Sequence, residues 1–158
     1  DGRLIAALEY SYRWNRSRIA KCRKFLVLCL RLGKHHFATF VGKKPILLVT
    51  FETVATLRAN SQNSHPFGWE LFKKNGWSHL SIISDGDTSF HDPKVYSYFD
   101  RLDDNGIFDD FDHVVFYGAG PCEYAAAAFS VATPGATVVA IQPQATLDSR
   151  VNEWDVVI

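Results

Sequence analysis

The residues best suited to chemistry lie together in one short segment, Gly118-Ala119-Gly120-Pro121-Cys122-Glu123, named here the glycine turn. It separates an apolar run that predicts a strand from an alanine-rich run that predicts a helix. Glycines at such a junction let backbone N–H groups approach an anion such as phosphate. Near a helix start, the Cys122 thiol is a candidate nucleophile with a lowered pKa. The third interpretation is structural: a tight reversal in which Cys122 is a small buried side chain.

The wider segment 114–148 predicts a strand, the glycine turn, a helix and a second strand, and it resembles the α/β-hydrolase superfamily. The nucleophile elbow of that superfamily is G-x-S-x-G. Gly118 matches the first glycine, Gly120 the serine and Cys122 the second glycine, while Tyr124-Ala125-Ala126 would begin the packing helix. The resemblance extends over about residues 45–148 and implies an α/β-hydrolase-like fold with a degenerate elbow.

The resemblance also implies that the elbow has lost its chemistry. Gly120 has no hydroxyl with which to attack a carbonyl, and Pro121 has no N–H to offer an oxyanion. One such donor stabilises a transition state by about 3–4 kcal/mol. The triad histidine should follow the nucleophile, yet the last histidine, His113, precedes the turn. We therefore expect a non-catalytic domain, with a thiol-dependent acyl transfer by Cys122 as one alternative.

A second alternative is a nucleotide-binding oxidoreductase. Gly118 and Gly120 match the first two glycines of the dinucleotide-binding pattern G-x-G-x-x-G and would face a flavin or NAD pyrophosphate. Glu123 replaces the third glycine, and Gln142 stands where a ribose-binding acid is expected. Because two of the four determinants are missing, we expect no cofactor and keep flavin or NAD as the alternative.

Other polar residues predict turns and solvated surface rather than a metal site. Asp85, Asp87, His91 and Asp92 follow a predicted strand, where a divalent cation could bind, but aspartates are also common in turns. The acids of residues 100–112 lack calcium-loop spacing. The three cysteines form no disulfide framework and no zinc pattern, which favours a reducing, cytoplasmic compartment.

The elements that would position the glycine turn alternate along the chain. Predicted strands cover residues 36–41, 45–51, 78–84, 112–117 and 136–141, predicted helices cover 69–75, 93–103 and 121–132, and 52–65 reads as a polar loop. Six aromatic residues could line a pocket, but core packing is their expected role: Trp69, Trp77, Phe90, Tyr96, Tyr98 and Phe99. This alternation predicts an α/β fold: an open, mainly parallel sheet of at least four strands in βαβ units.

The N-terminal part of the chain differs sharply in charge. Residues 1–44 contain eleven basic and two acidic side chains, net +9, whereas residues 45–158 contain six and fifteen, net −9. Helical spacing of apolar residues predicts helices over 4–14 and 17–32. We therefore expect two parts: a basic helical extension, 1–44, and an α/β-hydrolase-like domain, 45–158, which is expected to lack later strands. With no methionine, the sequence is expected to be a fragment or a processed form.

The positive charge of the basic extension indicates which kinds of partner the chain could bind. Its contact residues would be Arg13, Arg16, Arg18, Lys21, Arg23 and Lys24. We expect docking on a larger protein complex, or peripheral contact of residues 13–34 with an anionic membrane surface. Nucleic acid is not the expected partner. The alternative is that the extension folds back on the acidic part of its own chain.

Overall fold

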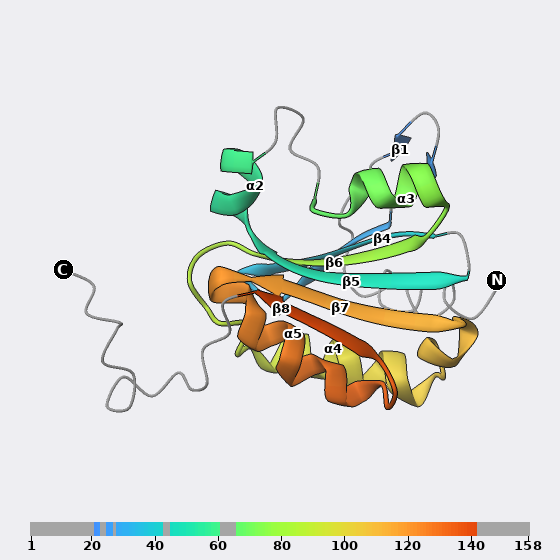
Figure 1. The fold of residues 1–158 in the computed structure, drawn as a ribbon. Helices are drawn as coiled ribbons and strands as arrows, with labels where there is room; N and C mark the ends of the chain where they lie inside the picture. Colours follow the sequence, from blue (N-terminus) through green and yellow to red (C-terminus); the bar gives the residue numbers. More distant parts are fainter. Residues whose placement is uncertain (1–20, 23–24, 27, 43–44, 61–65, 142–158) are drawn as a thin grey trace.

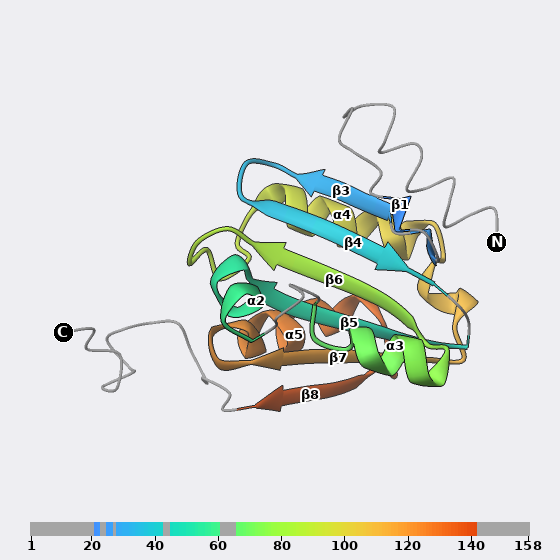
Figure 2. The same cartoon turned by 90° about the horizontal axis from the view of Figure 1, so that it is seen from above.

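The computed structural model describes residues 21–22, 25–26, 28–42, 45–60 and 66–141. A six-stranded sheet forms its centre, and Figure 2 shows the strands side by side in the order β3-β4-β6-β5-β7-β8. Their bounds are Leu28–Leu32 (β3), His36–Val41 (β4), Ser78–Ser84 (β6), Ile46–Thr53 (β5), His113–Ala119 (β7) and Thr137–Ile141 (β8). The short strands β1 (Lys21–Cys22) and β2 (Phe25–Leu26) form a separate antiparallel pair.

The strand order confirms the predicted α/β fold. β6, β5, β7 and β8 run parallel to one another, and β4 is antiparallel to both β3 and β6. From β5 the chain continues to β6 on one side, and from β6 it continues to β7 on the other side of β5. This reversal creates a topological switch point between β5 and β7, where open α/β sheets bind ligands at their carboxyl edge.

Helices cover both faces of the sheet (Figure 1). The short helices α2 (Val54–Asn60) and α3 (Trp69–Asn75) lie on one face, and α4 (Pro93–Asp104) and α5 (Glu123–Phe129) lie on the other. Single 3-10 turns occupy Phe108–Asp110 (η1), Gly120–Cys122 (η2) and Ser130–Ala132 (η3). The predicted helix 121–132 is therefore divided into three pieces.

Aromatic side chains build the core between the sheet and the α4–α5 layer. Phe99 of α4 stacks on Phe129 of α5 with ring centroids 4.6 Å apart, and Phe51 of β5 stacks on Phe129 at 5.5 Å. Phe90 and Tyr98 are also buried. The expectation of core packing is confirmed for Trp69, Phe90, Tyr98 and Phe99, whereas Trp77 is half-buried and Tyr96 is exposed.

The predicted helix over residues 17–32 is wrong for its described part. Residues 28–32 form β3, which pairs with β4 through a tight turn at residues 33–35. Leu30 and Leu32 are buried while Arg31 between them is exposed, which is the two-residue period of a strand. Packing of β3 beside α4 and pairing with β4 outweigh the helical spacing of its apolar residues.

Residues 28–41 also lie in the same sheet as residues 46–141, so the structure shows no boundary at residue 44. β4 pairs with β6 along its length, from His36 opposite Ser84 to Val41 opposite His79. The predicted helix 4–14 lies outside the described residues.

Residues 52–65 were expected to be a loop, but part of this segment is a helix. Residues 54–60 form α2, and the Thr53 hydroxyl accepts a hydrogen bond from the Thr56 N–H at 3.0 Å. This is the bond expected of a helix N-cap. Strands 36–41 and 78–84 and helix 69–75 have the predicted bounds. In the part of the chain that the structure describes, no helix is both long and apolar enough to cross a membrane.

Candidate functional site

The glycine turn is a close packing joint between β7 and α5. A Cβ on Gly118 would overlap the backbone carbonyl of Cys122, so this position requires glycine. Gly120 has φ +56°, in the left-handed region, yet a Cβ there would meet no atom within 4 Å. The tip of the turn is therefore strained for an ordinary residue but sterically open, and glycine removes the strain.

Cys122 has the properties of a buried structural thiol. Its side chain is 3% exposed. Burial, followed by the nearby acids Glu52, Glu123 and Asp87, raises its pKa to about 12. The thiol is thus protonated at neutral pH, which is the opposite of the lowered pKa that a nucleophilic cysteine needs. The structure favours the interpretation of Cys122 as a packing residue.

The same acids bear on the nucleotide-binding alternative. Glu123 is the first residue of α5 and is 1% exposed, and Glu52 is the last residue but one of the neighbouring strand β5. Negative charge at this position repels a pyrophosphate. The surroundings of Gly118 and Gly120 therefore disfavour an anionic cofactor at the glycine turn.

Glu52 is a buried acid that the sequence analysis did not single out. It is 7% exposed, and its Oε1 accepts a hydrogen bond from the Phe67 N–H at 2.7 Å. Burial raises its pKa to about 7, although the Phe67 amide and the Thr50 and Ser81 hydroxyls oppose the rise. Phe67 also stacks on Tyr117 of β7, with centroids 4.1 Å apart.

Polar side chains continue from Glu52 under the α2–α3 layer. Thr50 Oγ1 lies 2.9 Å from His79 Nε2 on β6, and both residues are buried. Burial lowers the pKa of His79 to about 4, so its ring is neutral. The structure thus places the Glu52 carboxyl at the switch point, near hydroxyl and imidazole groups. A carboxyl with a pKa near neutral can serve acid–base chemistry or bind a polar ligand.

A second polar network lies at the same edge of the sheet, around His36. His36 is the first residue of β4 and is 1% exposed. Its Nε2 lies 2.7 Å from Thr88 Oγ1. Its Nδ1 lies 3.5 Å from Asp92 Oδ2. Thr88 Oγ1 is also 2.8 Å from Ser84 Oγ at the end of β6. The sequence analysis had placed Asp92 near this edge but had no signal for His36.

The residues that were considered as ligands of a divalent cation lie on the surface or cap a helix. Asp85, Asp87 and His91 are exposed, and Asp92 caps α4 by accepting a hydrogen bond from the Lys94 N–H at 2.8 Å. Within the described ranges, no group of three or more His, Cys, Asp or Glu side chains is placed to hold a metal ion.

The acids of α4 and of the segment that follows it form an exposed surface. This acidic face consists of Asp100, Asp103, Asp104, Asp109 and Asp112. β3, which lies within the basic residues 1–44, packs beside α4. Of the predicted contact residues, Arg13, Arg16, Arg18, Arg23 and Lys24 lie outside the described residues, and Lys21 is described only as part of β1.

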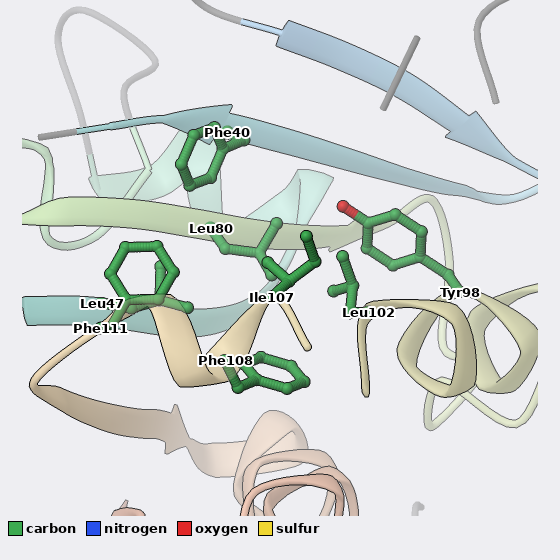
Figure 3. Close-up of a pocket in the computed structure, with 8 residues that line it drawn as sticks. All are labelled: Phe40, Leu47, Leu80, Tyr98, Leu102, Ile107, Phe108 and Phe111. Atoms are coloured by element: carbon green, nitrogen blue, oxygen red, sulfur yellow. The ribbon is translucent and has the colours of Figure 1, made fainter. Parts of the chain in front are cut away.

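An apolar cavity lies between the sheet and α4 (Figure 3). Its volume is about 10 Å³, and its lining includes Phe40, Leu80, Leu102 and Phe108, with the Tyr98 ring at one side. This volume accommodates about one water molecule. It is a small gap in core packing and does not have the size of a ligand site.

No protein-family model and no curated protein matches this sequence. Among solved structures, the chain is similar to ESTFA (FE-lacking apo form), with 12% sequence identity and a TM-score of 0.43. The match covers 96% of this chain and 56% of that chain.

Proposed function

We propose that the chain is a non-catalytic, α/β-hydrolase-like binding module whose basic arm, the part of the basic residues 1–44 that precedes β3, docks on an anionic surface of a larger complex or a membrane. The observation that carries the proposal is the construction of the glycine turn. Its tip, Gly120, has no side chain, Pro121 offers no N–H, and the Cys122 thiol is buried with its pKa raised to about 12. A turn without nucleophile or donor serves the packing of β7 on α5.

The charge distribution supports docking as the role of the arm. Residues 1–44 have a net charge of +9 and the rest of the chain −9. Concentrated basic charge attracts anionic surfaces and loses that attraction as salt rises. The acidic face on α4 competes with an external surface for the same arm. We therefore expect docking to be reversible and sensitive to salt.

The test is cosedimentation of the full chain with phosphatidylcholine vesicles containing 30% phosphatidylserine, with pure phosphatidylcholine as the neutral surface. Polyglutamate, titrated by fluorescence anisotropy, represents an acidic protein complex. We expect binding to at least one anionic surface at low salt, and its loss when Arg13, Arg16, Arg18, Lys21, Arg23 and Lys24 are all changed to Gln.

The matched control removes six positive charges from the remainder of the chain instead, at Arg58, Lys73, Lys74, Lys94, Arg101 and Arg150. This variant should bind as the unmodified chain does, provided that it remains folded by circular dichroism. Equal losses in both variants would show that total charge, and not the arm, drives binding. No binding by the unmodified chain to any anionic surface would refute the docking role.

A further inference from the structure

The strand β8 has an outer edge that can accept another strand. Within the described residues, β8 pairs with β7 alone, and Figure 2 shows it at the border of the sheet. Such an edge presents backbone N–H and C=O groups, and natural edge strands usually carry a charge, a proline or a bulge that prevents further pairing. β8 contains neither a charged residue nor a proline, and its register with β7 has no bulge.

Apolar side chains of β8 are exposed on both faces of the sheet. Val138 lies opposite Phe116, whose side chain is buried in the core, so Val138 is on the face that α5 covers. Val139 lies opposite Tyr117, so Val139 and Ile141 are on the other face. All three β8 side chains are at least 40% exposed. A helix or a membrane surface would cover one of these faces, whereas a strand paired edge to edge places side chains beside both.

Charged residues are absent from the segment that carries this edge. Residues 124–141 contain no Asp, Glu, Lys, Arg or His, and they are named here the uncharged edge. They form α5 after its first residue, η3 and β8, and Val131 in η3 is 80% exposed. The whole chain has a formal net charge of zero. A second copy of the chain can therefore approach the uncharged edge without electrostatic repulsion.

The border of the sheet at β3 has the opposite character. β3 contains the exposed Arg31, whose guanidinium donates hydrogen bonds to the carbonyls of Gly33 and Lys34 at 3.0 and 3.1 Å. β3 also lies within residues 1–44, whose net charge is +9. Two copies paired through β3 would bring these like charges together. Charge therefore selects β8, and not β3, as the edge at which two copies can meet.

We propose that two copies of the chain form a dimer in which their β8 strands pair antiparallel about a twofold axis at Val139. Directly opposite residues of an antiparallel pair share a face of the sheet. Val139 then meets the partner's Val139 on one face, and Val138 meets the partner's Ala140 on the other. The pairing uses both β8 edges, so the assembly closes after two copies. The dimer does not depend on the docking function of the basic arm.

The test is the mass of the full chain in solution, measured by sedimentation equilibrium at micromolar concentration. We expect twice the chain mass of 17.8 kDa. Val139→Lys places two positive charges opposite each other on the axis, so this variant should have the mass of a monomer. Val139→Glu should also be a monomer. An equal mixture of the two variants should regain the dimer mass, because opposite charges then meet across the axis.

The matched control is Tyr96→Lys, which adds the same charge at an exposed apolar residue of α4 and should leave the dimer intact. Circular dichroism checks the fold of each variant, and Val138→Lys, on the other face of β8, replaces a Val139→Lys variant that does not fold.

Three results would overturn the proposal. The first is a monomeric unmodified chain, which is the result expected if residues 142–158 cover β8. The second is a mass above that of a dimer, because a closed pair cannot grow. The third is a dimer that persists in the folded Val139→Lys variant, because the interface then lies elsewhere.

Discussion

At the residue scale, Gly118 and Gly120 are required for different physical reasons. Gly118 needs space, because a Cβ would overlap the carbonyl of Cys122 across the β7–α5 joint. Gly120 needs conformational freedom, because its φ is +56°, although the space around it is open. The two positions therefore form a matched pair for testing whether the glycine turn is a packing joint.

We expect Gly118→Ala to destabilise the fold by about 3 kcal/mol, because the added methyl group meets backbone that has to shift. Gly120→Ala should cost about 1 kcal/mol, the cost of a left-handed alanine in open space. Urea unfolding of both variants measures the difference. A Gly118→Ala variant as stable as Gly120→Ala would show that the joint is loose.

Glu52 should make stability depend on pH. Its pKa of about 7 in the folded chain lies above the ordinary value of 4.5, so the folded state retains a proton that the unfolded state releases. The stability gained from this proton is full below about pH 4.5 and is lost as the pH rises through about 7.

Glu52→Gln keeps a side-chain oxygen for the Phe67 N–H and abolishes the titration. Relative to this variant, we expect the unmodified chain to lose about 3 kcal/mol of unfolding free energy between pH 5 and pH 8. Guanidinium unfolding at the two pH values provides the measurement. Parallel pH profiles would mean that Glu52 titrates normally.

At the element scale, the β3–β4 hairpin belongs to the sheet and not to a separate arm. Removing residues 1–44 would leave β6 without its antiparallel partner and remove the buried side chains of Leu30, Leu32 and Ala38. We expect residues 45–158 alone to lose cooperative urea unfolding, whereas residues 28–158 retain it. A cooperative transition in the shorter chain would support the boundary at residue 44.

The elements that sequence could predict are those whose pattern admits one period. The strand 78–84 is a short apolar run between turn residues, and its bounds are as predicted. β3 could not be predicted because Leu30 continues the helical spacing of Leu26 but also fits the two-residue period with Leu32, and only pairing with β4 decides between them.

In the candidate site too, local features could be predicted from the sequence, whereas contacts between distant residues could not. The degenerate glycine turn is local, so its missing hydroxyl and N–H could be read from adjacent residues. Glu52 meets its Phe67 donor across 15 residues, and His36 meets Thr88 across 52. Such partners are brought together by the sheet, and no spacing rule in a single sequence predicts them.

At the scale of the whole molecule, the proposed binding role rests on two features, the opposite charges of the two parts of the chain and a glycine turn without a hydroxyl or an N–H at Gly120 and Pro121. The carboxyl edge of the sheet holds Glu52, the glycine turn and residues 85–92. The acidic face lies on α4 and on the segment that follows it. A binding role requires only that these surfaces be presented by a stable sheet, whereas acyl chemistry requires an attacking group at the turn.

The most direct test of this account is peptide-mapped mass spectrometry of the folded full chain after incubation with p-nitrophenyl acetate at neutral pH, with release of p-nitrophenol recorded in parallel. The account predicts turnover no faster than in buffer and no acyl adduct on residues 118–123 or Glu52. Sustained turnover together with an acetyl group on Cys122, or on another side chain bordering the glycine turn, would contradict it.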